Sequence, residues 1–312
     1  MSVSMHIPVL RDAVIAALIP HPEQPPKRVI DGTLGAGGHT AALLEAGAAE
    51  VLGLDRDPLA LGIAGENLAR YGERAHIAHA SYTDMREQAR TLGWDTVDAI
   101  LLDLGVSSMQ LDRAERGFAF RHEGALDMRF DPTSADSTAA ELVNGLEVDE
   151  LADIIYQYGE ERESRRIARA IVKARPYTTT TQLAAAVEKA MPRRHDDKIH
   201  PATKVFQALR IAVNDELNVI ESVIPTALDL LGVGGRLAII SFHSLEDRIV
   251  KEAFKLAATD CICPPKVPVC VCGHRATVSL ITRKPIVADE AEIAQNLRSR
   301  SAKLRVVEKL GS

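Results

Sequence analysis

The sequence predicts an α/β protein in which a Rossmann-like parallel sheet with crossover helices is interrupted by an inserted helical domain. Strand and helix patterns alternate at first, only helix-like and loop-like patterns follow from about 106 to 215, and the strand pattern then returns. The 312 residues are enough for one large domain or for a domain that carries an insertion. We therefore expect one domain from residues 1–105 and 216–312, and an inserted domain from residues 106–215.

Four strands and three helices are expected before the insertion. The run at 97–103 is almost continuously apolar, which is typical of a central strand buried on both faces. The run at 28–31 leads into a glycine-rich turn, the run at 51–55 ends in an aspartate, and the run at 75–80 is a weaker strand. The expected helices cover residues 40–46, 59–71 and 85–92.

Helical spacing dominates the middle of the chain, and the α/β pattern resumes after it. The expected helices of the insertion cover residues 137–143, 149–158, 164–175, 181–191 and 203–214. Beyond them we expect a helix over 216–231, a glycine turn at 232–235, a strand over 236–241, a helix over 245–258 and a final strand at 277–282. This last part completes the sheet that the first part begins.

The composition excludes several classes of protein. There is no run of eighteen apolar residues that could span a bilayer. The apolar run at 13–19 is short and lacks both the basic region and the small-residue cleavage site of a signal peptide. The four cysteines lie within residues 261–272, so no disulfide framework spans the chain. The cytoplasm is therefore the expected compartment.

The net charge of −6 hides an uneven distribution of charge. Residues 1–155 carry a net charge of −13, residues 156–210 carry +6 and residues 211–312 carry +1. The average argues weakly against a nucleic-acid partner, but the basic block predicts a second functional surface besides an acidic one. Aromatic residues make up 4% of the chain, which argues against a platform that stacks several bases of a single strand.

The first candidate site is the glycine-rich turn from Asp31 to His39, between an expected strand and an expected helix. Gly35, Gly37 and Gly38 let the backbone approach a nucleotide-like ligand, and the start of the helix supplies free N–H groups. The turn is not the dinucleotide fingerprint, because Thr40 stands where that motif needs glycine or alanine. A tight turn without a ligand is the alternative.

Three aspartates, Asp31, Asp55 and Asp103, are expected at strand ends along one edge of the sheet. Asp55 suits the diol of a ribose, which both NAD and S-adenosylmethionine contain, whereas Asp57 before Pro58 is expected to cap a helix. A site lined by carboxylates favours a cationic ligand such as a sulfonium and disfavours a pyrophosphate. For Asp103 alone, a role as a turn former is the alternative.

Two residues after the strand at 236–241 are candidate substrate contacts on the rim of the same cleft, His243 and Ser244. The alternative makes Ser244 a helix cap that is paired with Asp247. The two interpretations are compatible, because a cap at Ser244 leaves His243 free.

The basic block offers candidate phosphate contacts. Arg162, Arg165, Arg166 and Arg169 are spaced by three or four residues and therefore share one helix face. They form either a surface that is salt-bridged to the glutamates within 160–163 or a phosphate-binding surface. The second interpretation is favoured by further cations at Lys173, Arg175, Arg193, Arg194, Lys198, Lys204 and Arg210, and His200 lies among them.

Four cysteines form two closely spaced pairs, at Cys261, Cys263, Cys270 and Cys272. Four thiols within twelve residues suit zinc, but structural zinc sites usually separate the ligands of a pair by two to four residues, and here one residue separates them. Redox pairing and a thiol-rich loop are the alternatives. We therefore assign no metal from the sequence.

Together and in this order, these motifs resemble the bacterial ribosomal RNA small subunit methyltransferase H family, which methylates a cytidine of 16S rRNA at cytosine-N4. The resemblance runs through residues 6–10, 31–40, 54–58, 102–108, 110–112, 115–118, 126–129, 158–161, 200–203 and 240–248. It implies a class I S-adenosylmethionine-dependent fold, an inserted helical domain that helps to hold RNA, and 16S rRNA in the small ribosomal subunit as the partner.

The resemblance also implies the roles of individual residues. The cofactor contacts fall on the turn at Gly37, Gly38 and His39, on Asp55 for the ribose, on Tyr82 near the adenine, and on Asp103 and Gln110. Tyr82 stands where relatives often have phenylalanine, which keeps an aromatic surface. Asp103 is the candidate acceptor for the hydrogens of the cytosine amine, although the motif lacks the prolines and the aromatic residue of other amino-methyltransferases, and Asp103 equally suits the methionine end of the cofactor.

Three other functions remain as alternatives. An NAD-dependent oxidoreductase is disfavoured by Thr40 and Asp103. A non-catalytic rRNA-binding assembly factor predicts no cofactor, and a DNA amine methylase differs only in its substrate. The sequence leaves the oligomeric state open, with a homodimer as one alternative.

Overall fold

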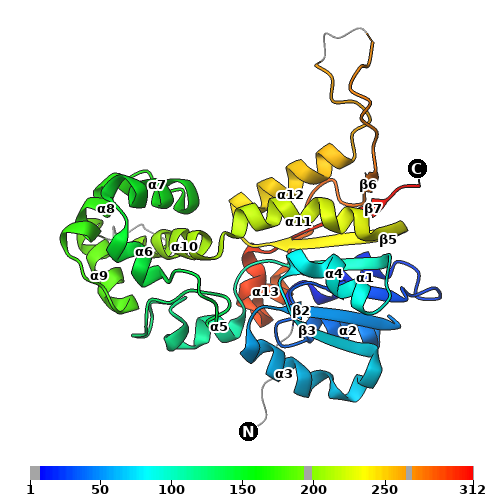
Figure 1. Ribbon diagram of the computed structural model, residues 1–312, viewed down its shortest axis with the longest axis horizontal. Helices are drawn as coiled ribbons and strands as arrows, with labels where there is room; N and C mark the ends of the chain where they lie inside the picture. Colours follow the sequence, from blue (N-terminus) through cyan, green and yellow to red (C-terminus); the bar gives the residue numbers. More distant parts are fainter. Residues whose placement is uncertain (1–7, 193–198, 265–268, 312) are drawn as a thin grey trace. The chain divides into compact units, whose positions relative to one another are not determined.

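The chain folds into two compact units. The computed structural model describes residues 8–192, 199–264 and 269–311 (Figure 1). The first unit comprises residues 1–105 and 217–312, and the second comprises residues 106–216. Residues 6 and 7 of the family motif, together with Arg193, Arg194 and Lys198 of the basic block, lie outside the described residues.

The first unit is built on a mixed sheet of seven strands in the order β3-β2-β1-β4-β5-β7-β6. The pairs among β1 to β5 are parallel, and β7 is antiparallel to both of its neighbours. The strands are β1 (Arg28–Asp31), β2 (Glu50–Asp55), β3 (Ala75–His79), β4 (Val97–Asp103), β5 (Leu231–Ser241), β6 (Val278–Leu280) and β7 (Lys303–Lys309). All strands expected from the sequence are present, and β7 is an addition to them.

The glycine turn expected at 232–235 is wrong, because these residues belong to β5. Leu231 pairs with Val97 and Arg236 pairs with Ala99, so the register between β4 and β5 shifts across the glycines. Gly234 has a φ of 78°, a left-handed conformation that glycine adopts without strain. The four residues therefore form an irregularity within the long strand β5 and not a turn between a helix and a strand.

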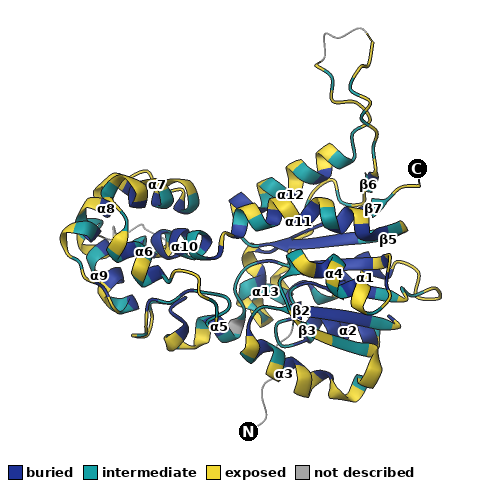
Figure 2. Cartoon of the chain, viewed as in Figure 1, coloured by how far each residue is buried: buried dark blue, intermediate teal, exposed yellow. Residues whose placement is uncertain are grey.

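Helices cover both faces of this sheet, whose strands are largely buried (Figure 2). One face packs against α1 (Arg11–Leu18) and α2 (Gly38–Glu45), and the other against α4 (Met85–Thr91), α11 (Glu216–Leu230) and α12 (Ser244–Ala257). Successive residues alternate between the two cores: Ile100 and Leu102 of β4 belong to one, and Ala99 and Leu101 belong to the other. Two further helices are α3 (Pro58–Leu68) and α13 (Glu290–Gln295).

The second unit is helical. Its helices are α5 (Ser108–Asp112), α6 (Ala139–Gly145), α7 (Val148–Gly159), α8 (Ser164–Lys173), α9 (Thr180–Ala190) and α10 (Pro201–Asn214). They enclose a separate hydrophobic core that includes Leu151, Ile167, Leu183 and Phe206. A Cβ atom on Gly159 would lie 2.7 Å from the carbonyl oxygen of Lys204, so this glycine lets α7 and α10 pack closely. The part of this unit that the structure describes contains no strand, only an isolated bridge between Ala125 and Thr179.

One asparagine ties an irregular segment of the second unit to its longest helix. Asn214 is 8% exposed, and its amide nitrogen donates to the carbonyl oxygens of Met128 (2.8 Å) and Arg210 (2.9 Å). Its side-chain oxygen accepts a hydrogen bond from the Phe130 N–H at 2.8 Å. These bonds satisfy backbone groups that the loop at 128–130 would otherwise leave unpaired.

Candidate active site

The three aspartates predicted at strand ends do end strands, and these strands are neighbours. Asp31 is the last residue of β1, Asp55 of β2 and Asp103 of β4. In the sheet β1 lies between β2 and β4, and all three run in the same direction. The acids therefore share the carboxyl edge of the sheet, where open α/β sheets bind their ligands.

Asp31 holds both ends of the glycine-rich turn through hydrogen bonds to Thr33 and Thr40. Its carboxylate is fully buried and accepts hydrogen bonds from the Thr33 N–H (3.2 Å) and from the Thr40 hydroxyl (2.8 Å). Burial raises the pKa of this carboxyl above its usual value, although the neighbouring His39 and the two donors oppose the shift. Thr40, noted in the sequence only as a departure from the dinucleotide motif, thus anchors the first turn of α2 to β1.

Asp55 holds the other side of the turn. Its two carboxylate oxygens accept hydrogen bonds from the Gly35 N–H and the Asp57 N–H, each at 2.8 Å. Burial raises the pKa of Asp55, and the two backbone donors oppose the rise. Asp57 caps α3 through the Leu59 N–H at 3.1 Å, so its predicted role as a helix cap is confirmed.

The turn requires glycine at two of the predicted positions. Gly35 and Gly37 have φ angles of 52° and 82°, in the left-handed region. A Cβ atom on Gly37 would also lie 2.9 Å from Cδ1 of Leu68. Gly38 is the first residue of α2, whose opening N–H groups face the same edge of the sheet as the strand ends.

His39 and Asp103 form a pair of largely buried polar groups at this edge. Nε2 of His39 lies 3.5 Å from Oδ2 of Asp103, and the Thr33 hydroxyl accepts the Asp103 N–H at 2.7 Å. Among the described residues, neither ring nitrogen of His39 nor Oδ1 of Asp103 has a hydrogen-bond partner. Buried polar atoms are rarely left unpaired, so these three atoms fit a ligand that supplies donors and acceptors. Thr33 is a site residue that the sequence did not single out.

Tyr82 lies next to the glycine-rich turn. It opens a short 3-10 helix, Tyr82–Asp84, that follows β3 and is capped by Ser81. A Cβ atom on Gly32 would come within 2.9 Å of Cβ of Tyr82 and 2.5 Å of Cδ2 of Leu102. The structure therefore brings Tyr82 to the edge that carries the three acids.

Gln110 belongs to the second unit, where it has a structural role. Its side-chain oxygen accepts the Ser107 N–H at 3.0 Å, and its own N–H donates to the Ser107 hydroxyl at 3.2 Å. This reciprocal capping box begins α5, and Gln110 is 5% exposed. Its contact with the cofactor remains a prediction.

The alternative interpretation of Ser244 as a helix cap is wrong, because α12 begins at that residue and is capped by His243. Nδ1 of His243 accepts the Glu246 N–H at 3.5 Å, and Oε2 of Glu246 accepts the N–H groups of Phe242 (2.8 Å) and His243 (3.2 Å). Glu246 is fully buried, and its Oε1 lies 3.0 Å from Nε2 of His243. His243 is therefore not left free, and its contact with a substrate, like that of Ser244, remains a prediction.

Asp247, which was expected to pair with Ser244 in a helix cap, instead binds two cations of β7. It accepts hydrogen bonds from Arg305 of β7 at 2.7 and 3.2 Å and from Lys303 at 3.3 Å. Burial alone would raise the pKa of Asp247, but these two cations hold it below its usual value. Asp247 thus fastens α12 to the neighbouring strand.

The arginines of α8 are exposed, as a phosphate-binding surface requires. Arg165, Arg166 and Arg169 lie on the outside of the helix together with Arg162 just before it. Within the described part of the chain none of them forms an ion pair, so the salt-bridged alternative does not hold for this face. Arg169 instead donates to the carbonyl oxygen of Arg165 at 3.1 Å.

Three of the other predicted contacts, Lys204, Arg210 and His200, are engaged within the second unit. Lys204 pairs with Glu161 at 3.0 Å, and Arg210 makes a bidentate pair with Glu216 at 2.7 and 2.8 Å. His200 caps α10 through the Ala202 N–H at 3.1 Å. Because the charges of Lys204 and Arg210 are balanced internally, Arg165 and Arg166 are the stronger candidates of the set.

Comparisons with known proteins identify the family. The model of the MraW methylase family matches residues 3–310. A protein of Nitratidesulfovibrio vulgaris named ribosomal RNA small subunit methyltransferase H is 50% identical, over 98% of this chain and 86% of its own length. A protein of the same name from Citrifermentans bemidjiense is 50% identical, over 98% of each chain.

Among solved structures, an rRNA methylase from Streptococcus thermophilus superposes with a TM-score of 0.42 at 13% identity, over 96% of this chain and 94% of its own. The part of the chain that the structure describes has no helix long and apolar enough to cross a membrane. The predicted fold class is confirmed by the family, as is S-adenosylmethionine as its cofactor, and an oxidoreductase is excluded. The chain belongs to the MraW methylase family, which is that of ribosomal RNA small subunit methyltransferase H.

Proposed function

We propose that this chain methylates the exocyclic N4 amine of a cytidine in the decoding region of 16S rRNA. The coarser statement, that it is an S-adenosylmethionine-dependent rRNA methyltransferase, follows from the family and from the names of relatives that are half identical over nearly the whole chain. One observation above all supports the cytosine amine as the methyl acceptor: Oδ1 of Asp103, beside His39 at the carboxyl edge of the sheet, has no hydrogen-bond partner in the described structure.

Asp103 has the chemistry that an amine substrate needs. The lone pair of the cytosine amine is delocalised into the ring, so the nitrogen must be held in place and its hydrogens need acceptors that favour rehybridisation. Oδ1 of Asp103 is a buried acceptor without a partner in the described structure, and it suits an N–H donor. The same carboxylate would take the proton that the amine loses, and His39 lies 3.5 Å from its other oxygen.

The residues of the glycine-rich turn would hold the cofactor. Asp55 faces the turn and suits the ribose diol, Tyr82 suits the adenine, and Gly35 to His39 allow a close approach of the backbone. When bound, S-adenosylmethionine supplies an activated methyl group on a positively charged sulfur. The carboxylates of Asp55 and Asp103 favour that charge.

The second unit is proposed to hold the RNA. Arg165 and Arg166 are exposed and unpaired within the described residues, and they carry charge that phosphate groups can neutralise. With 4% aromatic residues, the chain suits recognition of the RNA backbone and shape, with a single target base presented for reaction. A ribosomal substrate also agrees with the expected cytoplasmic location.

Nucleoside analysis of the methylated RNA tests the proposal. The purified chain is incubated with small subunits from a strain that lacks the enzyme and with radiolabelled S-adenosylmethionine, and the 16S rRNA is digested to nucleosides. We expect the label in N4-methylcytidine and in one fragment of the decoding region. Label in 5-methylcytidine or in another region would contradict the finer proposal, and binding without transfer would indicate a non-catalytic assembly factor. Naked 16S rRNA and a duplex DNA serve as comparison substrates.

A further inference from the structure

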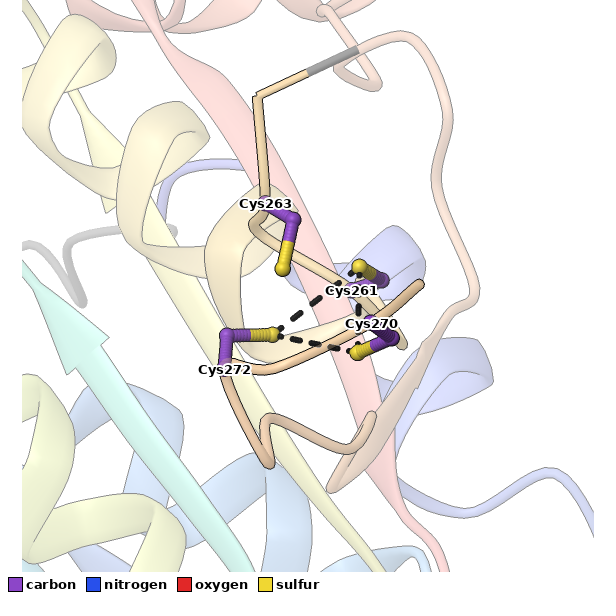
Figure 3. A group of neighbouring side chains, drawn as sticks. All are labelled: Cys261, Cys263, Cys270 and Cys272. Atoms are coloured by element: carbon purple, nitrogen blue, oxygen red, sulfur yellow. Dashed lines mark hydrogen bonds between the residues drawn. The ribbon is translucent and has the colours of Figure 1, made fainter. Parts of the chain in front are cut away.

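The four cysteines gather at one point of an arm in the first unit. The arm runs from the end of α12 to β6, and its base is closed by a hydrogen bond from the Thr277 N–H to the Ala257 carbonyl oxygen at 2.8 Å (Figure 1). Figure 3 shows the thiols of both cysteine pairs directed at one another. The Sγ atoms of Cys261 and Cys270 lie 3.5 Å apart, those of Cys270 and Cys272 3.6 Å, and those of Cys272 and Cys261 3.9 Å.

The described part of the arm has no apolar interior. Ile262, Val269 and Val271 are 51, 70 and 80% exposed, and around the cysteines it is the sulfur atoms that bring the two halves of the arm together. One backbone contact, from the Val271 N–H to Sγ of Cys263 at 3.4 Å, also ends on sulfur. A segment this small needs a metal or disulfides when it cannot form a hydrophobic core.

The single residue between the cysteines of each pair is unusual for a structural zinc site, but it suits two extended segments that face each other. In an extended segment, residues i and i+2 point to the same side and residue i+1 points to the other. Cys261 and Cys263 therefore point inward with Ile262 outward, and the pair around Val271 repeats the pattern. Two facing segments thus supply two thiols each to one centre.

The distances fit a tetrahedral metal and not the disulfide alternative. Zinc bound to sulfur at about 2.3 Å in a tetrahedron places its ligands about 3.8 Å apart. The separations among the Sγ atoms of Cys261, Cys270 and Cys272 span 3.5 to 3.9 Å, and all four Sγ atoms lie within 4.8 Å of one another. A disulfide requires about 2.05 Å, and the four cysteines are free thiols.

We propose that Cys261, Cys263, Cys270 and Cys272 bind one Zn²⁺ ion that folds the arm. Four thiolates complete the coordination of zinc and leave no open position, so the site is structural. Thiolate ligands select soft metals, which excludes magnesium and calcium. The proposal is independent of the methyl-transfer reaction, because none of the four residues belongs to the candidate active site.

Elemental analysis of the full-length chain tests the proposal. We expect about one zinc per chain after purification with a reductant and dialysis against metal-free buffer. The double variant Cys263→Ser/Cys272→Ser should lose the zinc, whereas the control Val271→Ser, which alters a residue between two ligands, should keep it. Zinc in fewer than about one chain in five, with four reduced thiols, would overturn the proposal, as would iron with acid-labile sulfide.

Two further measurements separate zinc from redox pairing. Cobalt should replace zinc and give the intense visible bands of a tetrahedral tetrathiolate site, and these bands should be absent in the double variant. Mass spectrometry without reductant should show four thiols that iodoacetamide modifies only after chelation. Native disulfides would instead lower the mass and leave the thiols unreactive after chelation, which would refute the zinc site. Removal of zinc should also expose residues 258–277 to proteolysis while the fluorescence of Trp94, buried in the sheet core, stays unchanged.

Discussion

Nε2 of His39, in the first turn of α2, lies 3.5 Å from Oδ2 of Asp103 at the end of β4. Both residues are set by neighbouring hydrogen bonds: Asp31 ties α2 to β1 through Thr40, and Thr33 accepts the backbone N–H of Asp103. Oδ1 of Asp103 and both ring nitrogens of His39 have no hydrogen-bond partner in the described structure. This arrangement is preorganised for a ligand and makes Asp103 the first residue to test.

Asp103→Ala should abolish methyl transfer while the protein stays folded. Removal of the acceptor should lower kcat by at least about 100-fold, the usual contribution of a positioned acid or base. Filter-binding assays with radiolabelled S-adenosylmethionine measure the rate, and the fluorescence of Trp94 checks the fold. The control is Glu87→Gln, an exposed acid on α4. Near-normal transfer by the Asp103 variant would remove it from the mechanism, and calorimetry with S-adenosylmethionine would show whether it serves the methionine end instead.

Charge reversal at Arg165→Glu/Arg166→Glu should weaken RNA binding. Each lost phosphate contact should also flatten the slope of log K against log salt by about 0.7 to 0.9, because fewer counterions are released. Fluorescence anisotropy with a labelled 16S rRNA fragment at several salt concentrations measures both effects. Arg90→Glu, an exposed arginine on α4, is the matched control. Equal affinities and equal slopes in all three proteins would reject the α8 surface.

Asp31 should make the first unit less stable as the pH rises. Burial raises its pKa in the folded state, so the folded protein binds the proton more tightly than the unfolded chain does. The stability of the native protein relative to Asp31→Asn is therefore highest below the unfolded pKa of about 3.9 and falls as the pH rises through the folded pKa. The loss is about 1.4 kcal/mol for each unit between the two pKa values.

Urea unfolding of both proteins between about pH 4 and pH 8 checks this prediction. The chain has one tryptophan, and Trp94 lies in the core of the first unit, so its fluorescence reports on that unit alone. The difference between the two unfolding free energies cancels the titration of groups that do not interact with Asp31. A difference that is independent of pH, or that favours the native protein at high pH, would contradict the shift.

Asn214→Ala should destabilise the second unit by about 2–4 kcal/mol, because it leaves buried backbone groups at 128–130 without partners. Hydrogen exchange measured by mass spectrometry should show faster exchange in this segment, and urea unfolding followed by circular dichroism gives the free energy. Asp153→Ala, at an exposed position of α7, should change the stability by less than about 0.5 kcal/mol. Similar values for the two variants would show that the asparagine bonds are not important.

The fold was predictable where the signals are local. Strands β1, β2 and β4 are short apolar runs that end in aspartate, and parallel strands buried on both faces have this composition. Strand β7 was missed because Arg305 interrupts its apolar residues. In the structure that arginine is neutralised by Asp247 on α12, a partner 58 residues away that no local pattern reveals.

The candidate site was predictable to a similar extent. The acids of the carboxyl edge follow from strand ends, but the roles of Thr33 and Thr40 depend on hydrogen bonds between separate segments. The cap of α12 was misassigned because Ser244 is a common capping residue, whereas the burial of Glu246 selects His243 one position earlier. Burial of that kind is decided by the tertiary structure.

The pairing of β4 with β5 has a consequence for folding during synthesis on the ribosome. The whole second unit is translated between these two strands, so β4 must wait for its neighbour on the order of ten seconds at ordinary rates of synthesis. During that time β4 is an edge strand whose backbone N–H and C=O groups on one side are unpaired. Its residues Ile100 and Leu102 are fully buried in the finished protein, so the exposed edge is prone to aggregation. The nascent chain therefore passes through a stage at which chaperones would be expected to bind it.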